Sequence, residues 1–140
     1  MKFRVSELMT RNLETISPAA TLEAAGKKMR ARNVGILPVV DGEKLVGVVT
    51  DRDIVLRAVS EKLRPEMTRV SEVMTSETIC CYEDQGITEV SLLMERNFVH
   101  RLMVLDREGK LVGIVSLSDI AAKTKNEALS GHVLGKVVAA

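Results

Sequence analysis

Two aspartates follow a hydroxyl-bearing residue at the same spacing: Asp53 comes three residues after Thr50, and Asp119 comes three residues after Ser116. An ionised carboxylate only accepts hydrogen bonds, so each aspartate can take two donors from a ligand at once. Each hydroxyl residue stands where an apolar run ends and a helix is expected to begin, and the positive end of a helix dipole favours an anion. The pattern therefore offers a paired acceptor beside an anion-binding position, twice in one chain.

The same spacing has an interpretation that needs no ligand. Ser or Thr followed three residues later by an acidic residue is also a helix-capping signature, in which each side chain bonds the backbone N–H of the other residue. A cap and a ligand site can coexist in one pair of residues. Both interpretations stay open for Asp53 and Asp119 at this point.

Other motifs of known chemistry are incomplete. Gly42 and Gly47 have the spacing of a phosphate-binding loop, but two valines replace the Lys and Ser/Thr that such a loop needs, which favours a hairpin. His100 and His132 stand apart from any cluster of acidic or sulfur ligands, so we expect no structural metal and no redox cofactor. No nucleophile stands with a base, and we therefore expect no catalytic residues and no enzyme activity.

The two aspartate motifs belong to an internal repeat, which has to be found before secondary structure is assigned. Val5–Thr10 recurs as Val70–Thr75 with an offset of 65 residues. After one extra residue in the second copy, an offset of 66 relates Asp53 to Asp119. The expected organisation is a first motif over residues 1–59, a linker over 60–69, a second motif over 70–122 and a C-terminal tail, predicted to be helical, over 123–140.

Each copy predicts the same order of elements. An extended piece at 13–16 or 78–81 precedes a helix whose apolar residues fit the i, i+3, i+7 spacing of one buried face. A second helix begins at Thr50 or Ser116. Two strand-length runs around a turn lie in the middle of each copy, at residues 35–40 and 45–49 and again at 101–105 and 111–115. The predicted fold class is α/β (α+β), with two β-α-β-β-α repeats that pack sheet to sheet with pseudo-twofold symmetry.

Composition excludes several classes of function. Lys and Arg total 20 against 19 for Asp and Glu, and only 2% of residues are aromatic, so we expect no nucleic-acid partner. No apolar run approaches membrane-spanning length and no signal segment begins the chain, so we expect no membrane partner. Cys80 and Cys81 are neighbours, and a bridge between them would be strained. We therefore expect free thiols and a cytoplasmic location.

The repeated order of residues resembles the CBS motif: a Met-Thr pair, a short strand, a helix, the run Gly35–Asp41, and a hydrophobic strand that ends in Thr-x-x-Asp-Ile. The resemblance covers residues 5–122 and occurs twice. The stretch 50–55 resembles that of small stand-alone bacterial proteins made only of a CBS pair, which are regulators. This resemblance implies a Bateman module with two related sites for AMP, ADP, ATP, NAD or S-adenosylmethionine in a cleft between the copies, and dimerisation into a flat disc.

An adenosine ligand needs an apolar slot for its base, an acceptor for its ribose diol and donors for its phosphates. The resemblance assigns the diol to Asp53 and Asp119, while the helix starts favour phosphate, with help from Arg52. Strand residues would wall the base and read its polar edge through their backbone groups. The expected binding residues are Thr15, Ile36, Leu37, Pro38, Thr50, Arg52 and Asp53 in the first copy, and Cys80, His100, Arg101, Leu102, Met103, Ser116, Ser118 and Asp119 in the second.

The two expected sites are not equal. Cys80–Glu83 replaces Thr15–Pro18, and Met103 replaces Pro38. An acidic side chain such as Glu83 near a phosphate would be repulsive. We therefore expect unequal affinities, although the sequence does not rank the two sites.

The sequence thus predicts a non-catalytic regulatory module that binds an adenine nucleotide and signals to a protein partner. A homodimer is expected near the first helices, because their apolar faces would exceed what one small core can hide. These faces carry Leu22, Ala25 and Met29 in the first copy, and Ile87, Val90 and Met94 in the second. The alternative is a structural or scaffolding homodimer that binds no nucleotide and holds a partner with the tail over 123–140.

Overall fold

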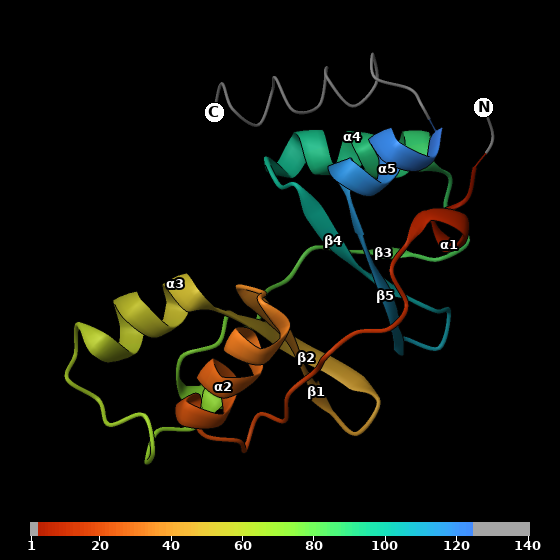
Figure 1. The fold of residues 1–140 in the computed structure, drawn as a ribbon. Helices are drawn as coiled ribbons and strands as arrows, with labels where there is room; N and C mark the ends of the chain where they lie inside the picture. The colour runs from red at the N-terminus through yellow and green to blue at the C-terminus, as the bar shows by residue number, and fades with distance from the viewer. Residues whose placement is uncertain (1–2, 125–140) are drawn as a thin grey trace. The chain divides into compact units, whose positions relative to one another are not determined.

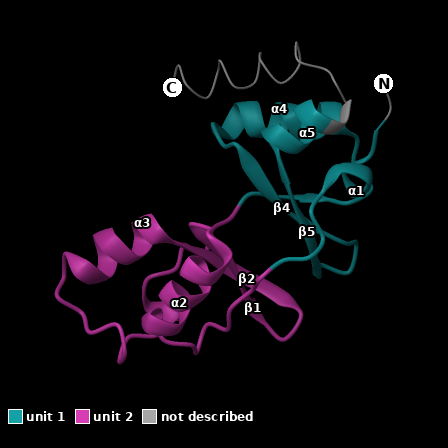
Figure 2. Ribbon diagram, in the orientation of Figure 1, with its two compact units in different colours: residues 1–13, 79–140 teal, residues 14–78 magenta. Residues whose placement is uncertain are grey.

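The computed structural model describes residues 3–124 and divides the chain into two compact units. One unit comprises residues 14–78, and the other combines the described residues of 1–13 and 79–140 (Figure 2). The mixed α and β class expected from the repeat is confirmed. Of the tail expected over 123–140 to be helical, residues 125–140 lie outside the described residues.

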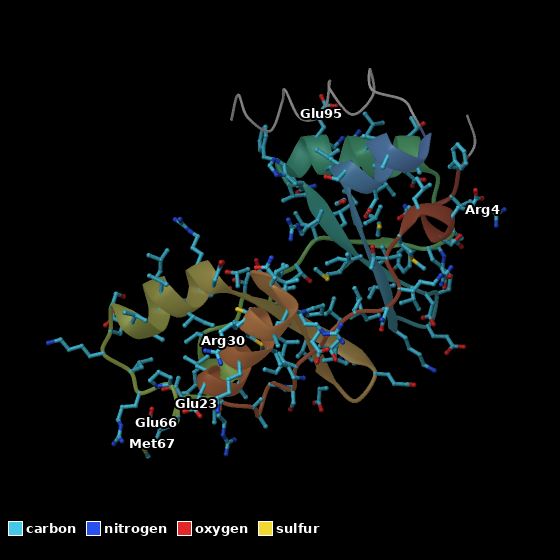
Figure 3. All side chains as sticks on the ribbon, viewed as in Figure 1. Arg4, Glu23, Arg30, Glu66, Met67 and Glu95 are labelled. Carbon is cyan, nitrogen blue, oxygen red and sulfur yellow. The ribbon has the colours of Figure 1, made fainter. Side chains whose placement is uncertain are left out.

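The unit of residues 14–78 is built on a two-stranded antiparallel sheet (Figure 1). Strand β1 (Ile36–Asp41) pairs with β2 (Lys44–Thr50) through a tight turn at Gly42, whose φ of 66° suits a glycine. The expected strand over 13–16 is reduced to one parallel bridge that joins Ile16 to Val39. Helix α2 (Leu22–Arg32) precedes the sheet, and its charged residues Glu23 and Arg30 are exposed (Figure 3).

The chain leaves this sheet through two short helical elements. Helix α3 (Asp51–Ile54) begins directly after β2 and continues into η1 (Val55–Val59), a π-helical turn. A single 3-10 turn, η2 (Val70–Glu72), follows after a loop. Both predicted starts of the second helix are confirmed, because α3 begins after Thr50 and α5 begins after Ser116.

The other unit is built on a three-stranded sheet in the order β3-β4-β5. Strand β3 (Cys80–Tyr82) runs parallel to β4 (Arg101–Leu105), which is antiparallel to β5 (Leu111–Ser116). Helix α4 (Ile87–Asn97) joins β3 to β4, and α5 (Leu117–Thr124) follows β5. The short helix α1 (Val5–Leu8) contacts both β5 and α5.

The leading segments of the repeats, residues 5–10 and 70–75, are exchanged. Val5 and Leu8 are core residues of the unit that holds β3–β5, and Val70 and Val73 are core residues of the unit that holds β1 and β2. The backbone contacts are equivalent in the two units. Val5 N–H donates to the carbonyl of Gln85 at 2.9 Å, and Val70 N–H donates to the carbonyl of Ala20 at 2.8 Å. Sequence repeats and compact units therefore divide the chain differently.

Each unit buries the apolar face of its own helix. The residues on these faces are at most 7% exposed: Leu22, Ala25 and Met29 on α2, and Ile87, Val90 and Met94 on α4. The expectation that these faces need a dimer to cover them is therefore wrong, because strand residues such as Leu37 and Leu102 already pack against them. Several exposed apolar residues follow α3 in the sequence, at Val55, Leu56, Val59, Leu63 and Met67. Met67 is labelled in Figure 3. Within residues 3–124, the model contains no helix long and apolar enough to cross a membrane.

Candidate functional site

Strand pairing gathers the expected residues of the first copy at one end of the β1-β2 sheet. Ile36, at the start of β1, pairs with Thr50 at the end of β2, and Asp53 lies three residues further on in α3. The residue that follows Thr15 donates its backbone N–H to the carbonyl of Pro38 at 3.0 Å. Residues far apart in the sequence thus meet at the β1-β2 sheet.

The second copy repeats this placement in its own unit. Arg101, at the start of β4, pairs with Ser116 at the end of β5, and Asp119 lies in the first turn of α5. Cys80 of β3 pairs with Met103 of β4. The side chains of His100, Arg101 and Ser118 are exposed.

Both aspartates cap the helices that carry them. Thr50 N–H donates to Asp53 Oδ2 at 3.0 Å, and Asp53 N–H donates to Thr50 Oγ1 at 3.0 Å. The bonds of Ser116 and Asp119 are 2.9 and 3.1 Å. The capping interpretation is confirmed. The cap uses one of about four lone-pair positions on each carboxylate, so other positions remain that could accept hydrogen bonds from a ligand.

The first amides of α3 already have acceptors. Asp51 N–H donates to the carbonyl of Gly35 at 2.9 Å, and Arg52 N–H donates to Asp51 Oδ1 at 2.8 Å. The next amide, that of Asp53, is bonded to Thr50 in the cap. Backbone donors for a phosphate, expected at this helix start, are therefore already occupied, and the exposed guanidinium of Arg52 is the donor that remains from the expected set.

Two of the residues expected to wall a base have side chains in the hydrophobic cores. Leu37 is 0% exposed and Leu102 is 1% exposed, and each packs within the core of its own unit. Successive side chains of a strand point to opposite faces, so their neighbours in sequence lie on the other face. Those neighbours are Ile36 and Pro38 in β1 and Arg101 and Met103 in β4. Pro38 and Met103 are also buried, whereas Ile36 is half-buried and Arg101 is exposed.

The two sites also differ beside the helix starts. A Cβ at Gly35 would lie 2.8 Å from Asp51 Oδ2, so the glycine makes room for this carboxylate. The second copy has His100 and Leu117 at the equivalent positions, and Leu117 is buried. The first site thus carries an acidic group that the second lacks.

Two residues outside the expected set contact Asp53. Thr75 Oγ1 donates to Asp53 Oδ1 at 3.3 Å, and Arg57 Nη1 lies 3.7 Å from the same oxygen. The side chain of Asp53 is 12% exposed. Thr75 is 22 residues from Asp53 in sequence, and its one signal was its place in the repeated Met-Thr pair.

Neither the cysteines nor the acidic residues suggest another centre. Burial raises the pKa of the Cys81 thiol to about 12, so it stays protonated at neutral pH, whereas Cys80 is half-buried. Among the residues that the structure describes, no group of three or more His, Cys, Asp and Glu side chains could hold a metal ion.

Comparisons with known proteins give a family match over both repeats. The family model described as CBS domain matches residues 5–60 and 70–125. The CBS domain-containing protein YhcV of Bacillus subtilis is 36% identical over 133 residues, which cover 95% of this chain and 94% of that protein.

Two similar solved structures were determined with bound ligands. The CBS domain pair of protein MJ0100, in complex with 5′-methylthioadenosine and S-adenosyl-L-methionine, has a TM-score of 0.75 and 26% identity, covering 91% of this chain and 99% of that one. The protein CBSX2, in complex with AMP, has a TM-score of 0.75 and 25% identity, covering 90% of this chain and 98% of that one.

Proposed function

This chain belongs to the CBS domain family, and we propose that it is a non-catalytic regulatory module that binds an adenosyl ligand and signals to a protein partner. The observation that carries the proposal is the repeated placement of a capped carboxylate, Asp53 or Asp119, beside paired strand ends. Similar structures that hold AMP or S-adenosyl-L-methionine support this ligand class. The candidates are AMP, ADP, ATP, NAD and S-adenosylmethionine.

The aspartates would hold the ribose. A diol presents two adjacent hydroxyl donors, and an ionised carboxylate can accept both. The cap holds one oxygen of Asp53 before a ligand arrives, because Oδ2 is already bonded to Thr50 N–H. A fixed acceptor loses less side-chain entropy on binding than a mobile one.

The base and the phosphates would use the other residues of each site. Thr15, Ile36 and Pro38 would flank the base in the first copy, and Cys80, Arg101 and Met103 in the second. Arg52 would be the phosphate donor of the first copy, since its guanidinium is exposed and the neighbouring amides are bonded. His100 and Ser118, both exposed, would approach the ligand in the second copy.

We expect a homodimer, which could cover exposed apolar residues such as Val59 and Met67, 61% and 71% exposed. A monomer at micromolar concentration in sedimentation velocity would contradict this part. Cys80 and Cys81 form no disulfide within the described residues, which fits a reducing cytoplasm.

The alternative function is a scaffolding homodimer that binds no nucleotide. One observation favours it: the carboxylate of Asp53 has partners without any ligand, in Thr50, Thr75 and Arg57. A carboxylate satisfied in this way could serve the fold alone.

Native mass spectrometry of the purified protein followed by calorimetry with AMP, ATP and S-adenosylmethionine separates these functions. We expect binding by the parent and a loss of about ten- to more than hundredfold when Asp53→Asn and Asp119→Asn are combined, because two ligand hydroxyls lose a charged acceptor. Asn keeps the size and much of the capping ability of Asp. Asp41→Asn, in the turn at the other end of β1, is the matched control and should bind as the parent does.

Two results would support the scaffold instead. One is a parent that carries no adenine nucleotide and gives no heat with any of the three compounds. The other is a double variant that binds within twofold of the parent, which would make the two carboxylates caps and nothing more.

A further inference from the structure

The carboxylate of Asp53 is held by more than its cap. Thr75 Oγ1 lies 3.3 Å from Oδ1 and 3.5 Å from Oδ2, and Arg57 Nη1 lies 3.7 Å from Oδ1. Arg57 stands one helical turn after Asp53, whereas Thr75 comes from the leading segment of the second repeat. Groups from two parts of the unit therefore converge on one oxygen.

These two partners are themselves fixed by backbone bonds. Arg57 Nη1 donates to the carbonyls of Val73 at 2.9 Å and Met74 at 3.1 Å, and to Thr75 Oγ1 at 3.4 Å. Thr75 N–H donates to the carbonyl of Val48 at 2.8 Å, and the N–H of that residue donates back at 2.9 Å. The network thus ties α3, η1 and β2 to residues 73–75.

The second copy has the same backbone frame, but its Thr10 does not take the place of Thr75. Thr10 N–H donates to the carbonyl of Ile114 at 2.8 Å, as Thr75 does to Val48, but the side chain of Thr10 is exposed. Within the described part of the chain, Thr10 makes no side-chain hydrogen bond to Asp119, whose carboxylate accepts from Ser116 N–H.

We infer that Thr75 and Arg57 are positioning residues for Asp53 and make the first copy the tighter of the two ribose sites. This inference rests on the proposed function. The cap and Thr75 use two of about four acceptor positions on the carboxylate, which leaves two for a diol. Because the carboxylate is already oriented, the diol meets it without the entropy cost of freezing a rotamer. Among the described side chains, Asp119 has no counterpart of the Thr75 contact, so its carboxylate must lose more freedom when a ligand binds.

The experiment compares AMP with 2′-deoxy-AMP, which lacks one hydroxyl of the diol. Dissociation constants are measured by calorimetry in an Asp119→Asn background, so that binding reports the first copy. In this background we expect AMP to bind about tenfold more tightly than 2′-deoxy-AMP, the effect of one hydrogen bond to a charged group. Thr75→Val should reduce this preference to twofold or less, because Thr75 no longer holds Asp53 Oδ1 in place for the diol.

Three further variants separate positioning from general destabilisation. Thr75→Ser keeps the hydroxyl and should restore the preference for AMP. Arg57→Met removes the second partner and should also lower the preference, which gives an independent test if Thr75→Val does not fold. Thr10→Val is the matched control in the other unit and should leave the preference unchanged. The ratio of the dissociation constants for 2′-deoxy-AMP and AMP does not change when both affinities fall through a loss of folded protein.

The outcomes distinguish this inference from the proposed function. A full preference for AMP in both Thr75→Val and Arg57→Met would overturn the positioning role while nucleotide binding stands. Loss of all AMP binding in the Asp119→Asn background, with binding retained in Asp53→Asn, would make the second copy the tighter site and overturn the inference. An unmodified protein that binds no adenosyl compound would overturn the proposed function itself, and the positioning role with it.

Discussion

Gly47 of β2 faces the carbonyl oxygen of Thr75 so closely that a Cβ at position 47 would lie 2.6 Å from it. Gly113 of β5 has the same relationship to Thr10, where the distance would be 2.9 Å. Neither glycine has a positive φ. The glycine of the repeated Leu-Val-Gly run is therefore needed for the close approach of a leading segment.

Gly47→Ala should lower the free energy of unfolding by about 1–3 kcal/mol, as overpacking of a close contact does. The atom that the new methyl group meets is a backbone carbonyl bonded to Val48, so it cannot swing aside as a flexible side chain could. Urea unfolding followed by circular dichroism measures the change.

Gly26→Ala is the matched control for this substitution. Gly26 lies inside α2 and is exposed, and an added Cβ would meet no atom within 4 Å apart from its chain neighbours and the backbone of its own helix. The change should raise the free energy of unfolding by about 0.5–1 kcal/mol, because alanine loses less backbone entropy in a helix. Equal effects of the two substitutions would contradict the close approach at Gly47.

The sequence predicted those parts of the fold that depend on local spacing. Thr50 and Asp53 stand three residues apart at the end of an apolar run, which is enough to predict a helix start. Asp41-Gly42 between two apolar runs predicted the hairpin, and Gly42 has the positive φ that such a turn uses.

The exchange of the leading segments could not be predicted in the same way. Val5 and Val70 begin nearly identical sequences, so either segment fits either core by its apolar pattern. The contact of Thr75 with Asp53 depends on this exchange, and no spacing rule relates residues 22 positions apart. Leu37 was expected beside a ligand, but strand alternation places it in the core.

The two cysteines should react at different rates with iodoacetamide at pH 8. The thiolate is the reactive form, and the pKa of Cys81 is raised to about 12 by burial, with its side chain 1% exposed. Cys80 is half-buried and should be alkylated first, whereas Cys81 should react only after urea is added. Peptide mass spectrometry identifies the modified residue. Alkylation of Cys81 in the native protein at the rate of Cys80 would contradict its burial.

The raised pKa of Cys81 also predicts a loss of stability at alkaline pH. An unfolded cysteine ionises near pH 8.5, so the unfolded chain releases this proton first and is favoured as pH rises toward about 12. Below the unfolded pKa the thiol is protonated in both states, and the contribution is fully present. Each pH unit within this window should cost up to about 1.4 kcal/mol. Cys81→Ala should reduce that slope, and an equal slope in both proteins would contradict the assignment.

AMP should slow amide hydrogen exchange in two separate stretches of the unit 14–78. The first stretch is Thr50–Arg57, where the proposed site lies. The second is Val73–Thr75, whose carbonyl and hydroxyl groups are bonded to Arg57. Thr75 N–H is bonded to the carbonyl of Val48, so its exchange requires the bonds between these two residues to open, and a ligand on Asp53 should make that opening rarer.

In Thr75→Val, AMP should still protect Thr50–Arg57 but give less protection at residues 73–75. Equal protection of residues 73–75 in the parent and in this variant would mean that the Asp53 network does not connect the ligand site to the leading segment.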